Sequence, residues 1–347
     1  MLKALGTYNL MPRKYPGEPE FNRSPNRQVV MNQILGRCRC FAAARGQSKK
    51  GPPLSGGIVY LCTMKSRIIN VLGGMAILMA AAACNNQGKC LKTELFSASD
   101  TTAHSSFTMK AELPAGKDAA SENIRRELIS VMDSQLAFIC SYEGDRVFPA
   151  FEGEGSNEAV FNYYKENAAK RLRDLGGEDA AERAEYFDGE IPGWEYEFSL
   201  AKTADTLGYI VFQNLDYVYT GGAHGGMVGQ GDICFDRETG ERIKILNDNV
   251  ADAMQPLLVK GLISYFSDYG EQMTEESLME HLMLWETTQI PLPGWDPRPS
   301  ADGLSFTYQQ YEIASYADGM PNFTIPYEDV APYLTPQAKK VLNMHQP

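Results

Sequence analysis

One segment, which begins at residue 64, has the features of an export signal and separates the residues before it from those that follow. Met64-Lys65-Ser66-Arg67 carries two basic groups, residues 68–79 are mostly apolar, and four alanines then precede Cys84. A basic start, an apolar run and small residues before a cleavage point are typical of a secretory signal peptide. The apolar run is too short to span a bilayer comfortably, which favours a removed signal over a permanent helix. We therefore expect residues 64–83 to be a signal peptide and the following residues to be exported.

The cysteine that follows the alanines resembles the lipobox cysteine of bacterial lipoproteins. In that class of signal the thiol of Cys84 forms a thioether with a lipid, and acyl chains hold the protein at a membrane surface. The resemblance implies a lipid anchor in the cell envelope. No acidic run follows Cys84 directly, so the periplasmic side is expected rather than the outer surface. The alternative is an internal buried helix in which Cys84 is an ordinary core residue.

Residues 1–63 differ in composition from the rest of the chain. They hold ten Lys and Arg against two Asp and Glu, with six scattered prolines and no sustained apolar period. Such a composition does not favour a packed core. We expect Met64 to be the true start and residues 1–63 to be unstructured upstream sequence. Alternatively, they form a basic cytoplasmic tail on an uncleaved anchor.

The charge of the exported part excludes one class of function. Residues 84–347 carry 20 basic and 42 acidic groups, a net charge of −22. A body this acidic repels phosphate backbones, so nucleic-acid binding is not expected, whereas a basic partner would be attracted. Its first residues, 84–104, are mostly polar and predict a flexible tether.

Four cysteines remain after removal of the signal: Cys84, Cys90, Cys140 and Cys234. Export permits disulfides, so Cys140 and Cys234 could pair. Two separate buried thiols are the other interpretation. There is no Cys-x-x-Cys, and no His or Cys spacing suits zinc, so neither a metal nor a cofactor is expected.

Two hydrophobic periods occur along the exported part. Residues 107–113 and 194–200 alternate apolar and polar side chains, which predicts half-buried strands. Residues 121–139 and 157–175 repeat apolar side chains at helical spacing, and Gly176-Gly177 is expected to end the second helix. Further extended segments are expected at 208–219, 233–245, 304–308, 313–316 and 323–327, and further helices at 253–266, 275–285, about 327–330 and from 336. Hairpins mixed with separate helices predict an α+β fold of antiparallel sheets and packed helices.

The most unusual stretch follows an aromatic strand and holds six glycines between Thr220 and Gly231. Glycine permits positive φ and close backbone approach. A phosphate-binding loop is excluded because no Gly-Lys-Ser/Thr occurs and no helix is predicted to open after the glycines. His224 lies among them, but a general base needs an orienting group and a nucleophile or water, and none is identifiable. A structural turn, with His224 bonded to backbone, is therefore favoured.

The run Tyr217-x-Tyr219-Thr220-Gly221-Gly222-Ala223-His224-Gly225 resembles the hallmark of the RsiV/PdaC-like extracytoplasmic domains. Residues 235–245, 304–319 and 325–335 fit the same family, so the resemblance covers about 105–340. It implies a two-part α+β ectodomain, which we expect as intimately packed subdomains over 105–228 and 229–345.

The resemblance also implies binding to an envelope ligand, because this domain in RsiV binds lysozyme and in PdaC precedes a peptidoglycan deacetylase domain. Sigma-factor regulation and deacetylation are not carried over. We expect a non-catalytic module for peptidoglycan fragments or a lysozyme-like basic hydrolase; the alternative is a cell-wall hydrolase using His224 and nearby carboxylates. The ligand-binding candidates are Tyr219, Thr220, Gly221, Gly222, His224 and Trp295. Trp295, in a proline-rich loop, is expected to be exposed, whereas Trp194 and Tyr196 are expected in the core.

Overall fold

The protein is an α+β fold built on a five-stranded sheet and a smaller three-stranded one. The structure, a computed structural model, describes residues 90–141, 144–152, 155–222, 225–267, 272–284 and 288–344. The large sheet has the order β1-β2-β3-β4-β5. Its strands are β1 (Thr93–Thr101), β2 (Ser105–Pro114), β3 (Trp194–Asp205), β4 (Tyr209–Tyr219) and β5 (Met227–Asp236). Signal residues 64–83, Cys84 and residues 1–63 lie outside the described part of the chain.

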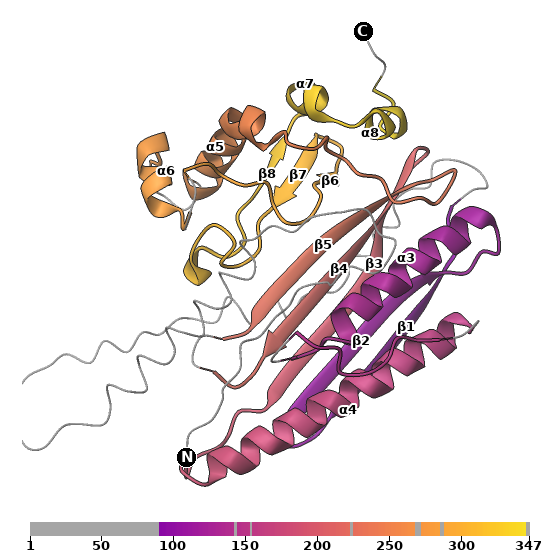
Figure 1. The fold of residues 1–347 in the computed structure, drawn as a ribbon, viewed down its shortest axis with the longest axis vertical. Helices are drawn as coiled ribbons and strands as arrows, with labels where there is room; N and C mark the ends of the chain where they lie inside the picture. The colour runs from indigo at the N-terminus through magenta and orange to yellow at the C-terminus, as the bar shows by residue number, and fades with distance from the viewer. Residues whose placement is uncertain are drawn as a thin grey trace, which may run out of the picture.

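Two long helices cover one face of the large sheet (Figure 1). They are α3 (Ala119–Leu136) and α4 (Asn157–Ala184), capped by the side chains of Asp118 and Ser156. Strand residues that point toward them, such as Met109 and Phe198, are at most 1% exposed because alternate side chains share one face. This helix-side core also buries Trp194 and Tyr196, which confirms their expected place.

The large sheet is antiparallel except for one pair. The expected α+β fold of antiparallel sheets and packed helices is confirmed, but β2 and β3 run parallel, a pairing that was not expected. The reason is that α3 and α4 lie between the two strands in the sequence and carry the chain back to the starting edge. A parallel pair needs such a crossover connection.

The C-terminal elements gather beside β5 (Figure 1). The small antiparallel sheet consists of β6 (Arg298–Pro299), β7 (Leu304–Thr307) and β8 (Asn322–Ile325). The helices are α5 (Ala251–Ser267), α6 (Glu275–His281), α7 (Tyr327–Val330) and α8 (Pro336–Val341), with short 3-10 turns η1 (Tyr316–Asp318) and η2 (Ala331–Tyr333). Their apolar side chains form a second core, which includes Val211 of β4 and Cys234 of β5. Among the described residues, no helix combines the length and apolar character needed to cross a bilayer.

Three expected boundaries differ from the structure. β1 lies within residues 84–104, which were expected to be a tether; its Phe96 stacks on Phe161 with ring centroids 5.4 Å apart. α4 continues through Gly176-Gly177, and Gly176 packs so closely on the carbonyl of His104 that a Cβ would collide with it. The expected boundary at residue 229 falls inside β5. This strand belongs to both cores, because Ile233 and Phe235 lie in one and Cys234 lies in the other.

Cys140 and Cys234 are free thiols that lie in different cores. Because the sheet separates them, they do not form the disulfide that was one of the two interpretations. Burial raises the pKa of the Cys140 thiol to about 12, and burial likewise raises the pKa of Cys234. Since only a thiolate is a good nucleophile, both side chains are chemically inert in the folded protein.

We predict that iodoacetamide at pH 8 leaves Cys140 and Cys234 unmodified in the native protein and alkylates both in urea. Mass spectrometry of the two cysteine-containing peptides measures this. Rapid native labelling of either residue, or a disulfide-linked peptide pair, would contradict the assignment.

Candidate functional site

The glycine-rich turn after β4 is held by an arginine from α4. Arg183 donates from both terminal nitrogens, one to the carbonyl of Thr220 and one to that of Gly221, each at 3.1 Å. Gly221 has φ +74°, a left-handed conformation that favours glycine. The turn is thus fixed through its backbone, and the side chain of Thr220 is not needed for this contact.

Asp179 positions that arginine. One carboxylate oxygen accepts from Arg183 Nε at 3.0 Å, and the other accepts from the indole nitrogen of Trp194 at 3.0 Å. Asp179 and Arg183 are one helical turn apart, which places them on one face of α4. The extension of α4 beyond its glycines therefore has a structural role, because it brings this pair to the glycine turn.

Tyr217 lies over the second part of the glycine segment. Its ring occupies the space where a Cβ on Gly226 would stand. The Gly226 carbonyl accepts a hydrogen bond from Tyr316 Oη at 2.8 Å, so a residue of η1 reaches the same point. The absence of a Cβ on Gly226 permits the close approach of the Tyr217 ring.

These residues form what we call the Tyr–Glu cluster: Tyr217, Tyr219, Tyr316, Glu195 and Glu197. Glu195 pairs with Tyr219, and Glu197 with Tyr217, across β3 and β4, so the four side chains share one face of the sheet. This is the face opposite to α3 and α4, and both glutamates are exposed on it. Burial is the main cause that raises the pKa of Tyr217 to about 12. The negative charge of Glu195 is the second cause, and Tyr316 contributes as well. The Tyr217 phenol therefore stays protonated and available as a donor.

The free edge of β5 is closed by two glutamine side chains. Gln310 accepts from the Val228 backbone N–H at 2.8 Å. Gln309 accepts from the Gln230 N–H at 2.8 Å and donates to the Gln230 carbonyl at 2.9 Å. These bonds replace the pairing that another strand would provide. Residues 313–316, which were expected to be extended, instead form a bend and the start of the 3-10 turn η1.

The structure places the ligand-binding candidates predicted from the sequence in different regions. Tyr219 belongs to the cluster, and Thr220, Gly221 and Gly222 form the adjoining turn. Trp295 lies elsewhere: it is partly buried, packs against the helix-side core and touches Gly231. It is therefore less exposed than its proline-rich loop indicated. His224 lies outside the described residues. Glu195, Glu197 and Tyr316 were not among the candidates, although the alternation of residues 194–200 places the two glutamates on the outer face.

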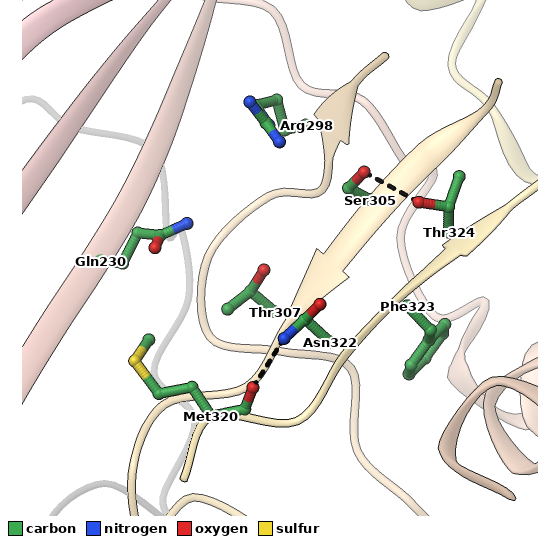
Figure 2. A pocket seen from close by; sticks show the side chains of 8 residues that line it. All are labelled: Gln230, Arg298, Ser305, Thr307, Met320, Asn322, Phe323 and Thr324. Carbon is green, nitrogen blue, oxygen red and sulfur yellow. Dashed lines mark hydrogen bonds between the residues drawn. The ribbon is translucent and has the colours of Figure 1, made fainter. Parts of the chain in front are cut away.

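A second feature is a small pocket between β5 and the three-stranded sheet, with a volume of about 260 Å³ (Figure 2). Its lining is mainly polar and consists of Gln230, Arg298, Ser305, Thr307, Met320, Asn322, Phe323 and Thr324. No sequence motif indicated it, because its residues come from four strands and a loop. Over the described ranges, no group of three or more His, Cys, Asp or Glu side chains could hold a metal ion.

The fold and these features define a class of protein: an α+β domain with two cores, a polar pocket and a sheet face that the C-terminal core covers only in part, leaving Glu195 and Glu197 exposed. Residues 299–328 match the family described as a protein of unknown function, DUF3298. Six of the eight pocket-lining residues lie within that matched segment. No curated protein matches the chain.

Two solved structures are similar to the chain, and both are DUF3298 family proteins. The crystal structure of a family member from Bacteroides fragilis has a TM-score of 0.57 at 19% identity, over 74% of this chain and 99% of that chain. One from Pseudomonas aeruginosa has a TM-score of 0.43 at 15% identity, over 72% of this chain and 96% of that chain. The likeness to the Bacteroides protein shows that the fold is shared.

We predict that Asp179→Ala lowers the free energy of unfolding by about 1–3 kcal/mol, because a partly buried carboxylate with two partners is lost. Urea denaturation followed by tryptophan fluorescence measures this. Glu182→Ala, a change at an exposed site on the same helix, is the matched control and should be close to neutral. Equal stability of the two variants would show that Asp179 does not hold the turn.

Proposed function

We propose that this protein is a lipid-anchored, non-catalytic binding protein of the bacterial cell envelope, and that its partner is a lysozyme-like basic hydrolase. The observation that carries the proposal is the Tyr–Glu cluster, which lies on the part of this sheet face that the C-terminal core does not bury. Tyrosine is enriched at the centres of protein interfaces because a rigid ring provides apolar contact and a hydroxyl provides a hydrogen bond.

The charge of the cluster favours a cationic partner. Glu195 and Glu197 are exposed and flank three tyrosines. Lysine and arginine side chains can pair with these carboxylates and can stack on the tyrosine rings. The net charge of −22 over residues 84–347 adds a long-range field that raises the rate of encounter with a basic protein. The resemblance to RsiV/PdaC-like domains supports the same class of partner.

The anchor is proposed from the sequence before the described residues. The basic residues at 64–67, the apolar run and the alanines before Cys84 have the order of a lipoprotein signal. Two or more acyl chains hold a protein at a membrane far more firmly than one. With such an anchor the body would lie at the envelope, on the periplasmic side.

A hydrolase is the second candidate, proposed for His224 with nearby carboxylates. The disposition of Glu195 and Glu197 argues against it. Both side chains are exposed on an open strand face, whereas a general acid in a glycosidase is tuned by an enclosed site. Release of muropeptides from cell-wall material by the purified protein would favour the hydrolase.

We predict that Glu195→Gln/Glu197→Gln slows association with a cationic lysozyme by about tenfold at low salt, because two steering charges are lost. Surface plasmon resonance at low and high ionic strength measures the association rate constant. The difference from the unmodified protein should shrink as salt screens the charges.

Glu166→Gln is the matched control for that double variant. Glu166 lies on α4, over the opposite face of the sheet, and its side chain is 69% exposed. Its loss should change association little. If the unmodified protein does not bind lysozyme, or if Glu166→Gln has the same effect as the double variant, the proposed surface is wrong.

For the anchor, we predict that mass spectrometry of the membrane-extracted protein finds an amino terminus at Cys84 with acyl chains attached. The Cys84→Ala variant should lose acylation and retain residues 64–83. An intact, unmodified amino terminus on a protein recovered from the cytosol would contradict lipid anchoring.

A further inference from the structure

The three-stranded sheet has one apolar and one polar face. Leu304, Phe306 and Ile325 point into the C-terminal core and are at most 3% exposed. The alternate residues point the other way, toward β5. Arg298, Ser305 and Thr324 form one cross-strand row, and Thr307 and Asn322 form the next. Because none of these five aligned residues is apolar, this face of the small sheet does not contribute to a hydrophobic core.

This polar face lines the pocket described above. Gln230 of β5 closes the opposite side, and Met320 and Phe323 complete the lining (Figure 2). The volume of about 260 Å³ is below the range typical of drug-sized ligands, so it suits one small polar molecule or a single sugar ring. No carboxylate is among the eight lining residues.

Arg298 is the one charged side chain among the eight residues that line the pocket. Its Nε lies 4.0 Å from Asp232 Oδ1, and within the described part of the chain its guanidinium makes no hydrogen bond. Its side chain is 39% exposed, so the guanidinium remains accessible to a ligand. Burial raises the pKa of Asp232, and Arg298 opposes that effect. The Asp232 carboxylate also accepts from Gln213 at 3.1 Å, which fixes it behind the arginine.

The remaining groups are suited to hydroxyl-rich ligands. Ser305 and Thr324 hydroxyls share a hydrogen bond of 3.1 Å, and the amide of Asn322 donates to the Met320 carbonyl at 3.0 Å. Each of these groups keeps further donor or acceptor capacity. A guanidinium recognises a carboxylate through two parallel hydrogen bonds, and hydroxyl and amide groups recognise sugar hydroxyls.

We propose that this pocket binds a carboxylated sugar, with its carboxylate on Arg298 and its ring hydroxyls or amide on Ser305, Thr307 and Asn322. The site shares no lining residue with the Tyr–Glu cluster, and it goes beyond the lysozyme-binding function proposed above. It does not depend on the lipid anchor. The acidic body repels anions at long range, so selectivity for a carboxylate depends on this one local cation.

The test is isothermal titration calorimetry of the full-length protein with two sugars that differ in one group. N-Acetylmuramic acid carries a lactyl carboxylate, and N-acetylglucosamine has the same ring without it. We expect N-acetylmuramic acid to bind at least about tenfold more tightly, since a charge-assisted contact is worth more than a neutral one. Acetyl-D-alanyl-D-alanine, a carboxylate on a peptide, should bind more weakly than N-acetylmuramic acid.

The variants separate the charge from the fold. Arg298→Gln should weaken N-acetylmuramic acid binding by about tenfold or more and leave N-acetylglucosamine unchanged. Arg242→Gln is the matched control, because Arg242 is 42% exposed, lies outside the pocket and should not alter binding. Thr307→Val keeps the arginine and should weaken binding several-fold. A thermal unfolding scan confirms that each variant is folded.

Several results would overturn the proposal. They are equal affinity for the two sugars, no heat of binding with N-acetylmuramic acid at millimolar concentration, and unchanged affinity in folded Arg298→Gln. Tighter binding of the peptide carboxylate than of N-acetylmuramic acid would reject the sugar. Lysozyme binding by Arg298→Gln is measured separately: its retention means that a negative sugar titration counts against this pocket alone.

Discussion

Burial of both faces where residues 210–212 of β4 pair with residues 233–235 of β5 is the constraint on which the rest of the structure depends. Phe212, Ile233 and Phe235 point into the core made with α3 and α4, while Val211 and Cys234 point into the C-terminal core. Because successive strand residues face opposite sides, a shift of one residue in either strand would exchange the two sets. The two cores are therefore not independent: one pair of strands supplies both, and a boundary through β5 cannot separate them.

The C-terminal segment also stabilises the strand edge that would otherwise stay open. Gln309 and Gln310 bond to the backbone of β5, and Tyr316 bonds to Gly226 just before it. These three residues follow β7, one strand of the sheet that carries the pocket. The glycine turn is held from its other side by Arg183. Two parts of the molecule thus meet at the Tyr–Glu cluster, and the position of its tyrosines depends on contacts from both.

Local patterns predicted much of the fold, and long-range pairing accounts for most of what they missed. The alternation in residues 194–200 and the helical period from residue 121 correspond to β3 and α3. β1 was missed because it is an edge strand whose outward side chains, apart from Leu95, are polar. The passage of α4 through Gly176 follows from a close contact with His104, far away in the sequence.

The candidate sites differ in the same way. Tyr219 and the glycine turn were found because they are contiguous. Tyr316 and the Arg298 pocket depend on strand register and on turns between elements, which no single window of sequence contains.

The point where the chain enters the folded body determines how far the Tyr–Glu cluster lies from the proposed membrane anchor. The Leu91 backbone N–H bonds to the Asp205 carboxylate at 2.9 Å, at the end of β3 next to the β3–β4 connection. The glycine turn is at the other end of β4, which has 11 residues, or about 35 Å of strand. A body attached to a bilayer through the residues before Leu91 would project the tyrosines outward by up to that length. The anchored end and the contacting end would then be opposite poles of one rigid sheet.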